Sequence, residues 1–348
     1  MAYTTIDNPS EFFNTLIWTG NGSNPRSHTG LGFKPDWTWH KIRDTASSHM
    51  LYDSTRGVGK RLHSNQNVAE ATETAEGTIT SFDSDGFTLA AGTSNDFYVN
   101  TSSKTYVAWN WKANGGTTTS FTESGSNPGG TYQANTTAGF SIVTYTGTGS
   151  AGTVQHGLGA VPELIIFKDR GDSSNWLVYT EPTGNTHTLF LNRTVAKEDD
   201  ATLYNDTTPT SSVFSLGAHN DVNENDDTYV AYCFTSIKGY SKIGSYTGNG
   251  SNDGTFVYTG FKPAWLLIKR TDAAEDWWLH DNKRNTINPI DKQLYANATS
   301  SEPTETSEDF VSNGFKFRNS NANWNASGGT YIYMAFAEHP FVSSKGVP

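Results

Sequence analysis

One seven-residue segment returns three times along the chain with the same alternation of side chains. The copies occupy residues 105–111, 228–234 and 330–336. In the first copy, Val107, Trp109 and Trp111 fall on one face of an extended strand, because successive side chains point to opposite sides. The opposite face begins with a tyrosine in every copy, so neither face is polar enough to be a solvated surface. The pattern predicts three strands that lie in hydrophobic cores.

Other segments repeat around this strand in a constant order. Each copy begins with a strand that ends in a glycine-rich turn, continues with a strand opened by a proline, and then adds a further strand. These segments are residues 17–23, 144–150 and 245–251, residues 32–41, 159–168 and 260–269, and residues 49–53, 176–180 and 277–281. Copies of about 100 residues with many short strands predict an all-β fold of three tandem β-sandwiches, of jelly-roll, concanavalin- or lectin-like type. An immunoglobulin-like topology is the alternative.

Two of the copies also carry a hairpin signal. Asp85-Gly86 and Asn313-Gly314 each lie close to phenylalanines on both sides, and such pairs favour a two-residue turn with positive φ. The second copy lacks this signal, so we expect its hairpin to differ.

The repeats place three domain boundaries. We expect an N-terminal segment and the first β-sandwich in residues 1–112, the second β-sandwich in residues 140–239 and the third in residues 240–348. Residues 113–139 contain no Leu, Ile, Val or Trp, and 16 of these 27 residues are Gly, Ser or Thr. This composition predicts a linker, with mobility concentrated after the first domain.

Composition and charge exclude several classes of function. A net charge of -11 without a cluster of Lys or Arg argues against nucleic-acid binding and against binding to an anionic membrane. Cys233 is the only cysteine, and its place in a core strand predicts a buried hydrophobic side chain. We find neither a signal-peptide pattern nor a membrane-spanning stretch, and therefore expect synthesis in a cytoplasm, which is compatible with a virion released by lysis.

Metal and cofactor sites are not predicted. Asp83 and Asp85 resemble the start of a calcium loop, but the third acidic position and the distal glutamate are missing. The third copy keeps only the glycine of this motif, as Gly314, which favours a turn. The acidic residues 220–227 favour a solvated loop, and the histidines do not have the spacing of metal ligands.

Thr38 and His40 are the first candidate site. At the corresponding positions the other two copies carry only Ile, Leu and Phe. The difference suggests that the first domain exposes a face that the other domains bury against each other or against another subunit. A histidine beside a packed layer is here favoured over a general base.

The Asp-x-x-Arg turns are the second candidate site. Asp53 and Arg56 follow a strand in the first copy, and Asp281 and Arg284 follow the matching strand, close to Trp277, in the third. An acid, a guanidinium and an aromatic ring are the groups that bind a sugar by hydrogen bonds and stacking. The alternative, which the short spacing favours, is a local ion pair of small energy.

Enzyme activity is not predicted. A retaining glycosidase needs two carboxylates about 5 Å apart, and no strand carries alternate acidic residues that would supply them. A serine nucleophile in a G-x-S-x-G turn after a strand is also missing. A polysaccharide depolymerase stays possible only through carboxylates that folding brings together.

Taken together, the chain resembles a family of virion structural proteins of tailed bacteriophages, especially marine ones, which are described as tail-fibre or particle proteins. The likeness rests on residues 1–10, on the Tyr-Thr-Gly-x-Gly-Ser turns, and on residues 81–89 and 106–113. It implies lectin-like jelly-roll modules on a phage particle and brings no catalytic residues.

We therefore expect a non-enzymatic surface protein of a virion, a tail fibre or a capsid-attached fibre or decoration. Its expected partners are other virion proteins and, as a homo-oligomer or in many copies, the chain itself, with a host surface glycan as a further ligand. We expect no cofactor, no nucleic acid and no membrane insertion. The alternatives are a soluble glycan-binding, lectin-like module and a polysaccharide depolymerase.

Overall fold

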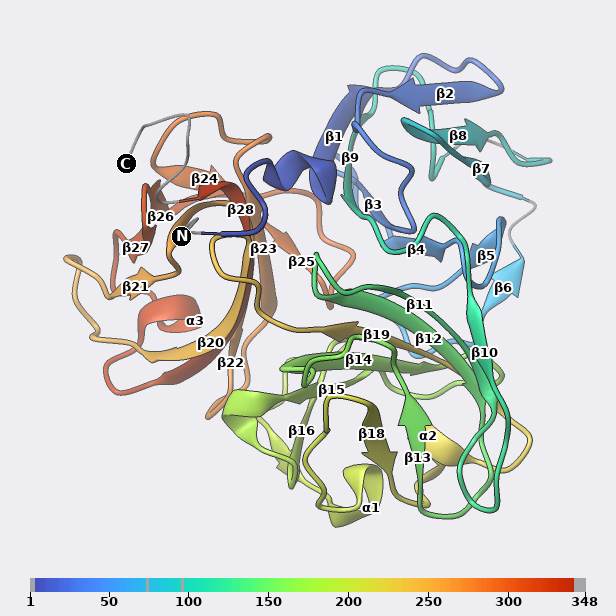
Figure 1. Cartoon of the computed structure of the whole chain (residues 1–348). Coiled ribbons are helices and arrows are strands. Elements are labelled where there is room, and N and C mark those ends of the chain that lie inside the picture. The colour runs from blue at the N-terminus through green and yellow to red at the C-terminus, as the bar shows by residue number, and fades with distance from the viewer. Residues whose placement is uncertain (1–3, 73–74, 95–96, 341–348) are drawn as a thin grey trace.

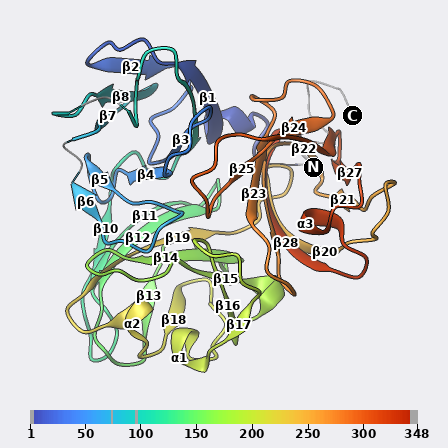
Figure 2. The same cartoon turned by 180° about the vertical axis from the view of Figure 1, so that it is seen from behind.

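The computed structural model describes residues 4–72, 75–94 and 97–340, and almost all of its regular structure is β. Figure 1 shows three groups of strands around the middle of the molecule, and Figure 2 shows the same arrangement from behind. We call them unit 1, unit 2 and unit 3 in chain order; each contains one copy of the repeated segment. The expected all-β, sandwich-type fold is confirmed. No helix of the described ranges is long and apolar enough to span a membrane.

Unit 1 consists of a main sheet, a smaller sheet and a two-stranded ribbon. Its elements are η1 (Pro9–Glu11), β1 (Phe13–Thr19), β2 (Arg26–Thr29), β3 (Trp37–Ile42), β4 (Met50–Asp53), β5 (Lys60–Arg61), β6 (Ala71–Thr72), β7 (Thr78–Asp83), β8 (Gly86–Ala90) and β9 (Thr105–Trp111). The main sheet has the order β1-β9-β3-β4, the smaller sheet the order β2-β8-β7, and β5 pairs with β6.

Unit 2 has the largest sheet. Its elements are β10 (Thr119–Phe121), β11 (Gly130–Asn135), β12 (Phe140–Thr146), β13 (Gly152–Gln155), β14 (Leu164–Asp169), β15 (Leu177–Thr180), η2 (Glu181–Thr183), β16 (His187–Phe190), β17 (Glu198–Asp199), α1 (Ala201–Tyr204), β18 (Val213–Leu216), α2 (Asn220–Asn223) and β19 (Thr228–Phe234). The eight-stranded main sheet has the order β10-β11-β12-β19-β14-β15-β16-β17, and β13 pairs with β18.

Unit 3 repeats the plan of unit 1. Its elements are β20 (Ser241–Thr247), β21 (Phe256–Tyr258), β22 (Phe261–Arg270), β23 (Trp277–Asp281), β24 (Ile290–Lys292), β25 (Leu294–Tyr295), β26 (Thr304–Val311), β27 (Gly314–Phe317), α3 (Ala322–Asn325) and β28 (Thr330–Pro340). The main sheet has the order β20-β28-β22-β23-β25, and the smaller sheet has the order β21-β27-β26-β24.

The repeated segment is a central strand in every unit. β9 lies between β1 and β3, β19 between β12 and β14, and β28 between β20 and β22, and all of these pairs are antiparallel. Both faces of these strands are buried, as their alternation predicted. The reason is that each main sheet is covered on both sides.

The two faces of each main sheet belong to different cores. The face that begins with the tyrosine packs inside its own unit: Tyr106 in unit 1, Tyr229 in unit 2 and Tyr331 in unit 3 lie in three separate clusters. The bulky face points to the middle of the molecule. There, side chains from all three units form one continuous cluster, which we call the central core.

Aromatic rings join the units across the central core. Trp37 of unit 1 stacks on Tyr232 of unit 2 with 4.5 Å between ring centroids, and Phe13 of unit 1 stacks on Phe336 of unit 3 at 5.1 Å. Phe336 also lies 6.1 Å from Phe234 of unit 2. The bulky faces of the repeated strands therefore pack against each other between the units.

The expectation of a linker at residues 113–139 is wrong. This segment contains β10 and β11, which extend the main sheet of unit 2 beyond β12. A sheet edge pairs through backbone groups, so a strand can join it without aliphatic side chains. Phe121 and Tyr132 supply the apolar contacts that hold the segment on unit 2.

The two predicted hairpins are present, but their turns lie one residue earlier than expected. Asp83 pairs with Gly86 and Val311 with Gly314, so each glycine opens the next strand. A Cβ on Gly86 would lie 1.8 Å from the carbonyl oxygen of His28, and one on Gly314 would lie 2.0 Å from that of Val257. Glycine is required here because a neighbouring strand comes too close for any side chain.

Substitution Trp37→Ala tests whether the central core joins the units. It removes a fully buried indole that contacts Tyr232 and should lower the free energy of unfolding by about 3–5 kcal/mol. Because the core is shared, the whole chain should still unfold in one transition, followed by calorimetry and by tryptophan fluorescence. Val58→Ala, at a side chain that is about half exposed, is the control and should change little. Two separate transitions in Trp37→Ala would contradict a shared core.

Candidate functional site

All seven residues that sequence analysis singled out are buried. None of them exceeds 8% exposure. They are Thr38, His40, Asp53, Arg56, Trp277, Asp281 and Arg284. A glycan or a partner in solution cannot reach these side chains, so the prediction that they bind one directly is wrong. Their contacts show what they do instead.

Thr38 and His40 face the inside of unit 1. The smaller sheet β2-β8-β7 covers this side of β3, and the ring of His40 lies 4.8 Å from that of Phe87 on β8. Burial lowers the pKa of His40 to about 3, with a further contribution from the charge of His28. The imidazole is therefore neutral and packs as an aromatic ring. The polar residue types suggested an exposed face, but the smaller sheet covers it.

We call the contact between units 1 and 2 the first seam, that between units 2 and 3 the second, and that between units 3 and 1 the third. At the first seam, Asp53 accepts hydrogen bonds from Arg56 Nε at 2.5 Å and from the hydroxyl of Tyr232 at 2.7 Å. Arg56 also contacts Glu70 at 2.8 Å, and Glu70 accepts a hydrogen bond from Arg170 at 2.9 Å. The turn thus anchors unit 1 on unit 2.

The third seam contains the same network with other residues. Asp281 accepts hydrogen bonds from Arg284 Nε at 2.5 Å and from Trp109 Nε1 at 2.9 Å. Glu302 lies between Arg284 at 2.9 Å and Arg43 of unit 1 at 2.8 Å. The favoured interpretation of the Asp-x-x-Arg turns, a local ion pair, is geometrically correct. What the spacing did not reveal is that each pair is buried and continues into the next unit.

The pKa values of the seam carboxyls follow from these contacts. Burial alone would raise the pKa of Glu302, but the hydrogen bond from Arg43 and the charge of Arg284 bring it below its usual value. In the same way, Arg284 outweighs the effect of burial on Asp281 and lowers its pKa. These carboxyls are ionised at neutral pH.

The second seam lacks the network, and all its members are replaced together. Thr180 and Thr183 stand where the other units have Asp and Arg, and Met334 stands in place of the tyrosine or tryptophan donor. At the first seam the amide of Glu70 donates to the carbonyl oxygen of Arg170, and at the third seam the amide of Glu302 donates to that of Arg43. At the second seam the amide of Lys197 donates to the carbonyl oxygen of Thr271 at 3.0 Å, so Lys197 takes the position of the two glutamates. No half of an ion pair is left buried alone, which would be costly.

Trp277 is a donor across the second seam. Its Nε1 donates to the carbonyl oxygen of Phe190 at 2.8 Å, and Trp176 Nε1 donates in the same manner to that of His63 at the first seam. His49 occupies the corresponding position in unit 1, and its Nε2 lies 2.8 Å from the carbonyl oxygen of Tyr295 at the third seam. The three bonds close a ring, and the indole of Trp277 does not serve as a sugar platform.

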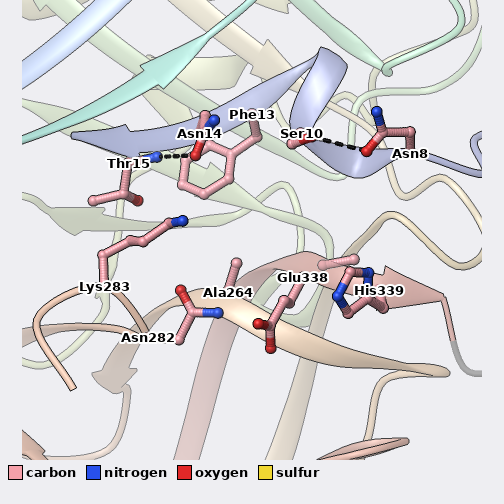
Figure 3. Close-up of a pocket in the computed structure, with 11 residues that line it drawn as sticks. Asn8, Ser10, Phe13, Asn14, Thr15, Ala264, Asn282, Lys283, Glu338 and His339 are labelled. Carbon is pink, nitrogen blue, oxygen red and sulfur yellow. Dashed lines mark hydrogen bonds between the residues drawn. The ribbon is translucent and has the colours of Figure 1, made fainter. Parts of the chain in front are cut away.

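A polar cleft at the third seam is the remaining candidate. It has a volume of about 240 Å³ and lies between η1 and β1 on one side and β22, β28 and the turn after β23 on the other. Figure 3 shows Lys283 extending between Thr15 and Asn282, with Glu338 and His339 further along the wall. The lining residues are Asn8, Ser10, Phe13, Asn14, Thr15, Ala264, Asn282, Lys283, Ala337, Glu338 and His339. These residues were not predicted because they come from distant parts of the chain, and because Asn282 and Lys283 are the variable residues of the Asp281-x-x-Arg284 turn.

A model of a protein family matches residues 8–340, which include all three units. The chain belongs to the DUF7483 family. This family is described as a domain of unknown function. No curated protein matches the chain.

One acidic cluster in this DUF7483 chain has the spacing of metal ligands. Carboxylate oxygens of Asp172, Glu224 and Asp227 lie within 4.8 Å of one another on partly exposed loops of unit 2. Exposed acids at a loop are common without an ion, and neither a histidine nor a cysteine from the described residues joins this group. We therefore draw no metal site from it. Asp85, the other calcium candidate, accepts hydrogen bonds from the amides of Gly30 and Gly32 and thereby stabilises the loop that follows β2.

A buried acid–base pair lies in unit 3. His280 Nδ1 lies 2.8 Å from Glu308 Oε1, and both side chains are fully buried between β23 and β26. His280 takes the position of Tyr52 in unit 1 and Tyr179 in unit 2. A substrate cannot reach this pair, so it belongs to the packing of the DUF7483 fold.

Substitution Glu302→Ala tests the network of the third seam. It leaves the buried Arg284 with one carboxylate instead of two, and we expect a loss of about 3–5 kcal/mol in the free energy of unfolding. Glu198→Ala is the matched control, because Glu198 forms an exposed ion pair with Arg193 that contributes about 0–1 kcal/mol. Urea unfolding of both variants measures the difference. Equal losses would show that the buried network has no special role.

Substitution His40→Phe tests the buried imidazole, since Phe167 holds this position in unit 2. The pKa of His40 falls from 6.5 to about 3 on folding, so the unfolded chain binds the proton first as the pH decreases. The free energy of unfolding should therefore decrease below about pH 6.5. In His40→Phe, the free energy of unfolding should therefore fall by roughly 2–3 kcal/mol less than in the native chain between neutral pH and about pH 4.5, as measured by urea titrations. An unchanged pH dependence would contradict the assignment.

Proposed function

We propose that this DUF7483 protein is a non-enzymatic structural or attachment protein of a bacteriophage particle, present in many copies on the tail or capsid. The observation that carries the proposal is the use of the recurring polar residues. The Asp-x-x-Arg turns were the best sequence candidates for chemistry, and they are buried in the first and third seams, where they fasten neighbouring units together. These polar residues therefore serve the internal structure of the chain, and this use supports a structural role.

Two further properties suit a particle that leaves its host cell. The units are held by a shared core and by buried ion pairs, and therefore need no covalent cross-link. Cys233 is fully buried, and burial raises the pKa of its thiol, which makes it a poor target for oxidation. The resemblance to phage virion proteins supports the same role.

A second candidate function is glycan binding. The polar cleft at the third seam favours it, because this cleft offers charged and amide side chains at the surface. The two functions are compatible, since an attachment protein can hold a host glycan.

Antibodies raised against the recombinant chain test the particle role. Immunogold labelling and mass spectrometry of purified virions from the phage that encodes the chain should detect it on the particle, in several copies. The amount of the chain in washed particles is compared with the amount in the particle-free lysate. If the chain is found only in the particle-free lysate, the proposal fails.

A further inference from the structure

The three seams differ in what crosses them. One backbone hydrogen bond within each unit marks the equivalent place beside each seam. The amide of Ser54 donates to the carbonyl oxygen of Asp36 at 2.8 Å in unit 1, that of Glu181 to Glu163 at 2.8 Å in unit 2, and that of Asn282 to Ala264 at 2.9 Å in unit 3. At the first seam the chain between Ala113 and Gln133 covers this place, and at the second seam the chain between Ser236 and Ile243 covers it. At the third seam the N-terminal part of the first unit meets the end of β28, and no connection between units passes there.

At the first seam, Gln133 of β11 in unit 2 fills this place. Its amide nitrogen donates to Ser54 at 2.8 Å and to Thr55 at 2.5 Å, and its oxygen accepts from the amide of Gly116 at 3.0 Å. The carboxylate of Asp36 holds the same segment by accepting from the amide of Ala113 at 2.7 Å.

A shorter connection fills the second seam. The hydroxyl of Ser236 donates to the carboxylate of Glu163 and accepts from the amide of Ile243 at 3.0 Å. At both seams, therefore, an acidic side chain anchors the chain that covers the space.

At the third seam no segment within residues 4–72, 75–94 and 97–340 covers this place, and the acid is missing. Ala264 stands where Asp36 and Glu163 stand, and the polar cleft opens beside it. Thr15 stands where the other first strands carry Ile142 and Ile243, so a hydroxyl replaces an apolar side chain. The volume of about 240 Å³ holds about eight waters at roughly 30 Å³ each, which is the scale of one sugar ring with its hydroxyl groups.

The walls of the cleft offer both donors and acceptors. Lys283 is exposed, and no described residue forms a hydrogen bond or ion pair with its ammonium group. On the acceptor side, Thr15 Oγ1 and Asn282 Oδ1 are buried without a hydrogen-bond partner within the described ranges. Both atoms have almost no accessible surface, so a ligand contacts them only when the side chains at the cleft move slightly, and the missing hydrogen bonds favour such a movement toward a ligand that supplies donors.

The charges narrow the class of ligand. The carboxylate of Glu338 is 2.7 Å from the ammonium of Lys262, so these two charges compensate each other and Lys283 adds one positive charge. A phosphate or another compact anion would satisfy Lys283 but would offer few donors to Thr15 and Asn282. A cation would be repelled by Lys283. Hydroxyl groups both donate and accept, and they suit all of these side chains.

We infer that the cleft at the third seam binds one unit of a saccharide. Lys283 and Asn282 contact its hydroxyl groups or a ring carboxylate, and Thr15 lines the floor. The inference deepens the attachment role proposed above and rests on it for its biological meaning. Asn282 and Lys283 are the two middle residues of the Asp-x-x-Arg turn of unit 3, and the inference does not use the buried Asp281, Arg284 or Trp277.

A glycan array of defined neutral and acidic saccharides, probed with the full chain, tests the inference. The native chain should bind at least one member, and calorimetry with that saccharide gives the affinity. Lys283→Ala removes an exposed side chain without disturbing the core and should weaken binding about tenfold or more, as expected for loss of a charge-assisted hydrogen bond. Ala264→Glu introduces the residue of unit 2 and should abolish binding by filling the cleft.

Phe256→Ala is the matched control. Phe256 is about half exposed on β21, the edge strand of the smaller sheet of unit 3, and is not part of the cleft. Its variant should bind within about twofold of the native chain, a difference of under 1 kcal/mol, and melting temperatures confirm that all variants fold. A blank array, unchanged affinity in Lys283→Ala, or loss of binding in Phe256→Ala would overturn the inference. A blank array does not affect the detection of the chain on virions, so the two proposals fail separately.

Discussion

The structure depends on one constraint: each main sheet has a second apolar face that its own unit does not cover. Trp37, Trp109 and Trp111 in unit 1 would be exposed if that unit stood alone, and Phe336 in unit 3 would be exposed in the same way. A large apolar side chain gains about 1.5–3 kcal/mol from full burial. The sum over the central core far exceeds the contribution of any single ion pair. The units therefore pack around a common centre, and the seams follow from this packing.

The polar residues of the seams determine which surfaces meet. A buried ion pair adds little net stability, but leaving one partner alone is costly. If unit 3 took the place of unit 2 against unit 1, Asp53 would lose the hydroxyl donor of Tyr232 and Glu70 would lose Arg170, because unit 3 carries Met334 and Thr271 at these positions. The second seam avoids such a conflict because Thr180, Thr183, Met334 and Thr271 carry no charge at these positions. The networks thus give the ring a fixed order.

Much of the fold was predictable because alternation along a strand is a local property. The strand at residues 105–111 and its two repeats were recognised from residues that are neighbours in sequence. Which core each face of the strand joins depends on residues far away in sequence, because the same alternation suits a core within a unit and a core between units. For residues 113–139, low apolar content suggested a linker, but backbone pairing with β12 does not depend on side-chain type.

The candidate site was less predictable for the same physical reason. Asp53 and Arg56 gave a pattern that fits a sugar site but favours an ion pair, and the approach of Tyr232, far away in sequence, decides between them. The cleft that remains open joins Thr15 to Asn282 and Lys283. Asn282 and Lys283 are the variable residues of the Asp281-x-x-Arg284 turn and Thr15 belongs to no motif, so their proximity depends on closure of the ring.

The central claim is that the three units form one cooperative structure around a shared core. Native-state hydrogen exchange, followed by mass spectrometry, measures this most directly. The amides of β9, β19 and β28 should exchange at one common, slowest rate, because each becomes accessible only when the whole chain unfolds. If one of these strands exchanged much faster while the other two stayed protected, its unit would open alone, and the account of a shared core would be wrong.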